Sequence, residues 1–148
     1  MINYIISNRY ELISSATKAL AHFIAKDASI SGEYAYIFKY FKQKVNILKS
    51  CPEIGNIVAL RYTYNNGFTL MIYNLVIKNK SSDKPTYKDL TTSLEQMEVH
   101  ARKNKIKIIN LAMTRVDIGL DGLDWDKVLK IITKIFEQST ITINIFVF

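Results

Sequence analysis

The side chains that most often carry out chemistry in proteins are scarce in this sequence. It contains one cysteine, Cys51, and two histidines, His22 and His100, which are far apart along the chain. A zinc site needs about four suitably spaced ligands, so the sequence predicts no structural zinc. It also lacks a Walker-type phosphate loop, a glycine-rich dinucleotide fingerprint and the Ser, His, Asp order of a hydrolytic triad. We expect neither a metal nor an organic cofactor.

Polar residues that could bind a ligand gather in three segments, each of which follows an apolar run. These segments are 28–34, 78–87 and 114–124. In sheets of parallel strands, the loops that lead from strands into helices meet at one edge, and ligands bind there. The sequence therefore predicts a ligand site beyond the carboxyl ends of the strands.

Short runs rich in β-branched and aromatic residues predict the strands. The expected strands are 2–6, 19–25, 57–64, 68–77, 107–113 and 140–148. The residues Asn65, Asn66 and Gly67 between the third and fourth runs are typical of a hairpin turn, because they tolerate positive φ.

Helical spacing of apolar residues predicts three helices. The first runs from Glu33 to about Ser50, and its expected apolar face includes Phe38, Phe41, Val45 and Leu48. The second begins after Thr86, which with Asp89 resembles a capping box, and continues to about 103. The third begins after Asp124, a typical N-cap residue.

Strands interleaved with three helices indicate an α/β protein with three layers, α/β/α, around a mixed sheet. A chain of 148 residues buries about two thirds of its unfolded surface, and the composition does not shift along it. We therefore expect a single domain over residues 1–148. We place His22 in its core, His100 on its surface and Trp125 beneath the loop before the last helix.

The charge of the chain favours anionic partners. Twenty Lys and Arg against 13 Asp and Glu give a net charge of +7, but no run of five basic residues occurs, so a solvated surface is the simpler interpretation. The aromatic residues of 34–41, 62 and 64 are of a type that stacks on nucleic-acid bases, yet their spacing fits the core better. The apolar start of the chain is too short for a secretory signal or a membrane span. We expect an intracellular protein, cytoplasmic or nuclear, without contact to a membrane.

Three stretches are distinctive in their residue order: LAHFIAKD at 20–27, LVIKNKSSDKPTYKDL at 75–90 and MTRVDIGLDGLDW at 113–125. In this order they resemble the macro domain, and within it the branch of terminal ADP-ribose glycohydrolases. The resemblance covers nearly the whole chain, and its last two stretches are the most specific. It implies the macro-domain fold and an enzyme, expected to be a monomer, that removes mono-ADP-ribose from protein or nucleic acid.

The resemblance also implies the catalytic residues. Lys78 falls at the position of the family's lysine nucleophile, which attacks the anomeric carbon of the distal ribose. Asp121 falls at the position of the acidic residue that assists the leaving group and resolves the lysyl adduct. A lysine attacks only as the neutral amine, so Asp121 is expected to act mainly as a proton acceptor.

The implied ligand-binding residues show departures from the family. Ser7, Asn8 and Arg9 stand where the family has a Gly-Asp step that binds adenine, and Asn8 keeps a carbonyl acceptor without the charge. Of the glycines in the family's first phosphate loop, this sequence retains Gly32. Its second phosphate loop, at 116–119, gains the carboxylate of Asp117. The implied ligand-binding residues are Asn8, Gly32, Glu33, Tyr34, Asp117, Ile118, Gly119 and Leu120.

These departures keep two alternatives open. Carboxylates at Glu33 and Asp117 would repel a diphosphate, which favours a non-catalytic module that binds ADP-ribose or a related nucleotide through a reshaped pocket. A scaffold that has lost its ligand is the third possibility.

Overall fold

The computed structural model describes residues 1–6, 8–29, 35–113 and 122–147, and these form six strands and five helices. The strands are β1 (Ile2–Ile6), β2 (Ala19–Ala25), β3 (Ile57–Thr63), β4 (Thr69–Lys78), β5 (Ile108–Met113) and β6 (Thr142–Val147). The helices are α1 (Arg9–Ser14), α2 (Ala35–Phe41), α3 (Lys44–Lys49), α4 (Tyr87–Lys103) and α5 (Trp125–Phe136).

All six strands belong to one sheet, in the order β1-β6-β5-β2-β4-β3. Five strands are parallel, and the edge strand β3 is antiparallel to β4, so the sheet is mixed as predicted. The interior strands β2 and β4 are buried along almost their whole length. This burial explains their continuous apolar sequence, because parallel strands at the centre of such a sheet are covered on both faces.

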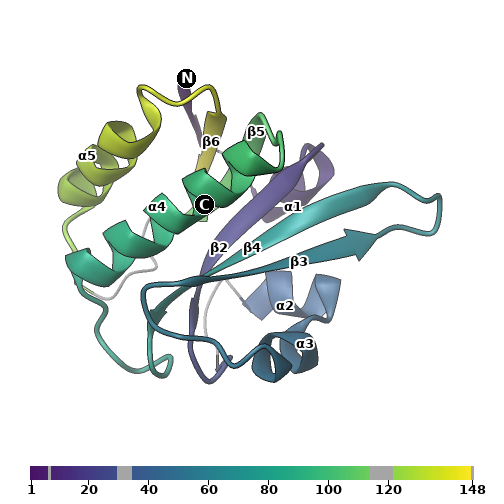
Figure 1. Cartoon of the computed structure of the whole chain (residues 1–148), viewed down its shortest axis with the longest axis horizontal. Helices are drawn as coiled ribbons and strands as arrows, with labels where there is room; N and C mark the ends of the chain where they lie inside the picture. The colour runs from purple at the N-terminus through teal and green to yellow at the C-terminus, as the bar shows by residue number, and fades with distance from the viewer. Residues whose placement is uncertain (7, 30–34, 114–121, 148) are drawn as a thin grey trace.

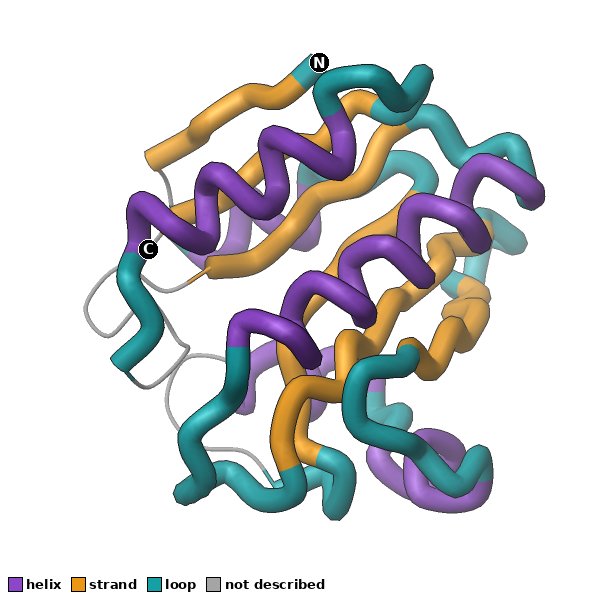
Figure 2. The backbone as a smooth tube through the Cα atoms, turned by 60° about the vertical axis from the view of Figure 1, so that its left-hand side comes forward, coloured by secondary structure: helices purple, strands orange, loops and turns teal. Residues whose placement is uncertain are grey.

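The helices cover both faces of this sheet (Figure 1). Tyr73 and Asn74 are neighbours on β4, so their side chains point to opposite faces. Tyr73 contacts His100 of α4, whereas Asn74 bonds to His22, whose ring packs against Phe38 of α2. The helices α4 and α5 lie side by side on the first of these faces (Figure 2). The predicted three-layer α/β/α architecture is therefore confirmed.

Most local predictions are also confirmed. The hairpin joins β3 to β4, and among its turn residues Gly67 adopts a positive φ of 86°. Thr86 caps α4 by accepting a hydrogen bond from the Asp89 N–H at 3.1 Å, and its hydroxyl donates to the Asp89 carboxylate. Asp124 caps α5 by accepting from two backbone N–H groups of its first turn.

The single helix predicted from Glu33 to Ser50 is wrong. Residues 33 and 34 lie outside the described residues, and the rest forms two helices that are separated at Lys42, where φ is +53°. The break rotates the second helix, so α3 buries Ile47 and leaves Val45 and Leu48 exposed. Periodicity did not reveal the break because apolar residues continue at helical spacing across it.

Two further differences concern α1 and His100. The sequence predicts neither a strand nor a helix between β1 and β2, but this stretch forms α1, which is capped by Asn8 and buries Leu12 and Ile13. His100 is half-buried rather than solvated, because its Nδ1 lies 2.8 Å from the hydroxyl of Tyr73. None of the described helices combines the length and apolar character needed to cross a bilayer.

Candidate functional site

The carboxyl ends of β2 and β4 lie level with one another. Ala25 pairs with Lys78 in the parallel register, and the pairing continues past the strands. The Lys26 N–H donates to the Lys78 carbonyl at 2.6 Å, and the Asp27 N–H donates to the Asn79 carbonyl at 3.1 Å. The loops after both strands therefore start side by side, as expected for a ligand-binding edge of an α/β sheet.

Lys78 is the last residue of β4 and is half-buried. Its Nζ donates a hydrogen bond to the Ser81 carbonyl at 3.0 Å. An open pocket of about 350 Å³ lies beside it, lined by parts of the β4–α4 loop together with Ile54 and Asp89. The amino group thus lies at the sheet edge in a fixed environment and next to space that a ligand can enter.

A chain of hydrogen bonds connects Lys78 to the loop after β2. Asp27 Oδ1 accepts from both the N–H and the hydroxyl of Ser29, at 2.9 and 2.5 Å. These bonds from Ser29 hold the pKa of the Asp27 carboxyl below its usual value. The Ser29 hydroxyl oxygen in turn accepts from the Ser81 N–H at 2.9 Å, and the Ser81 carbonyl receives the bond from Lys78.

Sequence reasoning missed Ser29 and Ser81. The Asp-x-Ser spacing of 27–29 is a local turn pattern and signals only the bond between Asp27 and Ser29. The bond between Ser29 and Ser81 joins residues far apart in the chain, and no sequence pattern announces it.

The two most specific stretches of the sequence contact each other in the structure. The hydroxyl of Tyr87, in the KPTY stretch, accepts a hydrogen bond from the Asp124 N–H at 2.8 Å. Gly122 has a φ of +89°, and a Cβ on it would lie 3.4 Å from Cε of Lys84. Glycine suits this position because it adopts positive φ without strain and leaves room for the lysine. Residues 122–124 therefore pack against residues 84–87.

Replacing Tyr87 by Phe is expected to weaken this contact. The change leaves the Asp124 N–H without its acceptor but keeps the ring, so the free energy of unfolding should fall by about 1 kcal/mol. Thermal unfolding would show this as a drop of about 3 °C in Tm. The matched control is Lys127→Ala, which removes the ammonium group 5.6 Å from the Tyr87 ring and leaves the hydroxyl bond intact. An unchanged Tm in the Tyr87 variant would contradict the stabilising role of this bond.

The predicted site residues are only partly within the described structure. Gly32, Glu33, Tyr34, Asp117, Ile118, Gly119, Leu120 and Asp121 lie outside the described residues. Asn8 is described, and its Oδ1 accepts hydrogen bonds from Tyr10 N and Glu11 N at 3.0 and 3.1 Å. The oxygen expected to bind adenine therefore caps α1, and the implied adenine contact stays a prediction.

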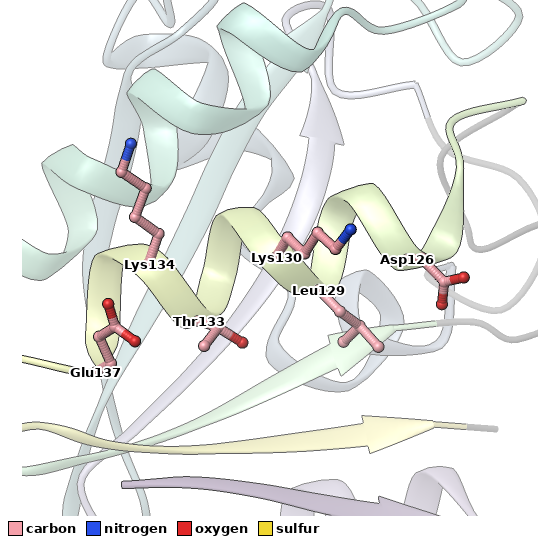
Figure 3. Close-up of a pocket in the computed structure, with 6 residues that line it drawn as sticks. All are labelled: Asp126, Leu129, Lys130, Thr133, Lys134 and Glu137. Carbon is pink, nitrogen blue, oxygen red and sulfur yellow. The ribbon is translucent and has the colours of Figure 1, made fainter.

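Other places in the fold offer less for chemistry. A hollow of about 440 Å³ is lined only by residues of α5 and its end, including Asp126, Lys130 and Glu137 (Figure 3). Side chains from one helix do not converge on a reacting atom, so we do not assign the site to it. Within 1–6, 8–29, 35–113 and 122–147, no three His, Cys, Asp or Glu side chains are grouped as metal ligands would be.

The fold and this edge of the sheet define a macrodomain. The macrodomain of Mycobacterium tuberculosis DarG superposes with a TM-score of 0.83 over 99% of this chain and 97% of that chain, at 19% sequence identity. Thermosipho africanus DarTG in complex with ADP-ribose gives a TM-score of 0.78 over 98% of this chain and 41% of that one, at 16% identity.

Sequence comparison is more specific than the fold. No family model matches the chain. The ADP-ribose glycohydrolase OARD1 of Homo sapiens is 34% identical over 131 residues, which cover 88% of this chain and 82% of that protein. The chain therefore belongs to the macro-domain family of ADP-ribose glycohydrolases that includes OARD1.

Proposed function

We propose that this protein hydrolyses the bond between mono-ADP-ribose and a protein or nucleic acid, with Lys78 as the nucleophile and Asp121 as the acid/base. The observation that carries the proposal is the packing of residues 122–124 against 84–87. It joins the residues directly after Asp121 to the loop that begins at Lys78. The relationship to the ADP-ribose glycohydrolase OARD1 supports the same reaction.

The proposed reaction has two steps. In the first, the neutral Nζ of Lys78 attacks the anomeric carbon of the distal ribose, and the bond from that carbon to the leaving group breaks. The proton lost by the amine passes to Asp121 and on to the leaving group. In the second, Asp121 accepts a proton from water as the water attacks the same carbon. Asp121 passes this proton to Nζ as the bond from the carbon to Nζ breaks, so that free ADP-ribose and the neutral lysine are released and Asp121 is again ionised.

We assign ligand binding to the loops at the same edge. Asn8 is the proposed adenine contact, and the close approach of backbone to phosphate is assigned to Gly32 and Gly119. The remaining proposed contacts are Glu33, Tyr34, Asp117, Ile118 and Leu120. We further propose a monomer that acts in the cytoplasm or nucleus. Its single cysteine, Cys51, is exposed, which is compatible with a reducing compartment.

The test separates the enzyme from a binding module. The wild-type protein is incubated with an ADP-ribosylated protein and, separately, an ADP-ribosylated oligonucleotide, and released ADP-ribose is measured. Binding of free ADP-ribose is followed by calorimetry and thermal unfolding. At 100 times its Kd, the ligand should raise the free energy of unfolding by about 2.7 kcal/mol. We expect both binding and release.

Binding without release would favour the non-catalytic module, which the carboxylates of Glu33 and Asp117 support as the second candidate. Neither binding nor release would contradict both candidates and leave the scaffold interpretation.

A further inference from the structure

The positive charge of the chain is concentrated in one region. Residues 35–82 carry seven Lys and Arg residues and one acidic residue, Glu53, and so hold +6 of the net charge of +7. Glu53 is paired with Lys26, at 3.5 Å between Nζ and Oε2. This region forms α2, α3 and the β3–β4 hairpin, which lie together at one end of the sheet (Figure 1).

Aromatic rings form a continuous row on the same region. Successive ring centroids are 4.8 to 5.6 Å apart along the row. Its two ends, Tyr40 and Phe68, are 44% and 42% exposed, while Tyr62 and Tyr64 are half-buried. We call this row the aromatic row, and its members are Tyr40, Phe41, Tyr62, Tyr64 and Phe68.

Three lysines lie on the same side of the sheet as the aromatic row. Phe41 of α2 contacts Tyr62 of β3, so the row follows the face that α2 and α3 cover. Lys39 belongs to α2, Lys42 to the turn after it and Lys44 to the start of α3, and all three are exposed. Arg61 does not belong to this surface, because it precedes Tyr62 on β3 and points to the opposite face.

Exposed rings in a segment with seven cations and one carboxylate, that of Glu53, suit one kind of partner. Single-stranded nucleic acid offers base faces that stack on aromatic rings and phosphates that pair with lysines. We propose that the aromatic row and the adjacent lysines 39, 42 and 44 bind single-stranded nucleic acid. This inference does not depend on the hydrolytic activity.

The aromatic row lies away from the proposed catalytic edge, whereas Lys44 is near enough to Asp27, in the loop after β2, to help lower the pKa of its carboxyl. Tyr62 pairs with Leu70, and the stretch of β4 from Leu70 to Lys78 spans about 26 Å at the usual rise per residue. Binding of an oligonucleotide to the aromatic row can therefore be measured without occupying the site beside Lys78. Loss of this binding need not alter hydrolysis of a small substrate.

The test is fluorescence anisotropy with labelled DNA and RNA single strands of about 15 nucleotides, at several salt concentrations. Two variants probe the surface: Tyr40→Ala combined with Phe68→Ala, and Lys39→Gln combined with Lys42→Gln and Lys44→Gln. We expect the aromatic variant to bind at least about 10-fold more weakly. The lysine variant should reduce the slope of log K against log salt by about 2.

The control variant loses the same three positive charges elsewhere, through Lys103→Gln combined with Lys107→Gln and Lys130→Gln. These three lysines are also exposed. It should retain most of the affinity, and thermal unfolding should show that all variants are folded. Three results would overturn the proposal: no binding by the wild-type protein at low salt, equal losses in the lysine variant and the control, or wild-type affinity in the aromatic variant. Displacement of the oligonucleotide by an acidic peptide at equal concentration would indicate a protein partner instead.

Discussion

Replacing Lys78 by Ala is expected to abolish turnover, with a fall in kcat of at least about 10³-fold. The reason is chemical, because alanine has no group that can attack the anomeric carbon and form the covalent adduct. The fold should persist, since the change is made at the half-buried end of β4, where Nζ donates to the Ser81 carbonyl, and leaves the buried part of the strand intact. Single-turnover measurements of ADP-ribose release would quantify the effect.

Two further variants test whether Lys78 acts as a nucleophile or only through its positive charge. Lys78→Arg keeps the positive charge but is not an effective nucleophile, so it should be as inactive as Lys78→Ala. Lys80→Ala removes an exposed lysine of the same loop and should retain most of the activity. Mass spectrometry of rapidly quenched wild-type protein should find an ADP-ribosyl group, with the mass of ADP-ribose less one water, added to Lys78. Wild-type turnover in the Lys78→Ala variant would exclude the proposed mechanism.

Acidification is expected to destabilise the protein through His22. The ring is fully buried on β2, and its Nε2 lies 2.5 Å from Asn74 Oδ1. Asn74 donates its own N–H to the Val58 carbonyl, so its oxygen faces the histidine and Nε2 carries the proton. Nδ1 then has no hydrogen-bond partner among the described residues. Burial lowers the pKa of His22 to about 4, although the hydrogen bond to Asn74 opposes this shift.

The direction of the pH effect follows from this lowered pKa. Between pH 6.5 and about 4, the unfolded chain binds a proton at His22 and the folded protein does not. The free energy of unfolding should therefore be unaffected by His22 above pH 6.5 and should fall by about 3 kcal/mol as the pH drops to about 4. Urea unfolding at intervals from pH 7.5 to 4 would measure this loss.

The matched variant is His22→Gln, which can still donate to Asn74 but does not titrate. Its stability should vary less with pH over this range than that of the wild-type protein. His100 has a pKa that burial also lowers, so His100→Gln serves as the second control. Equal pH dependence in the wild-type protein and the His22 variant would show that His22 is not the responsible group.

Local patterns in the sequence were sufficient for most elements of the fold. The apolar runs of β2 and β4, the glycine of the hairpin turn and the caps at Thr86 and Asp124 are properties of short segments. Whether such a segment forms a strand, a turn or a helix cap depends on backbone preferences and on side-chain hydrogen bonds within a few residues. Alternation of such segments also determined the three-layer class of fold, because strands and amphipathic helices have few ways to bury their apolar sides together.

The helix prediction failed where local and tertiary preferences differ. The residues around Lys42 have apolar spacing compatible with a continuous helix, but α2 and α3 each turn a different side to the sheet. Burial of Phe41 and Ile47 determines those orientations, and no short segment contains that information.

By itself, the sequence determined the six strands, the helices α4 and α5, the fold class and the place of Lys78 directly after the apolar run of β4. Only the tertiary structure decided which loops meet at that residue: the link through Ser29 and Ser81, and the packing of Gly122 and Asp124 on the KPTY stretch. These contacts join segments tens of residues apart, and they form because parallel strands bring the loops that follow them to the same edge of the sheet.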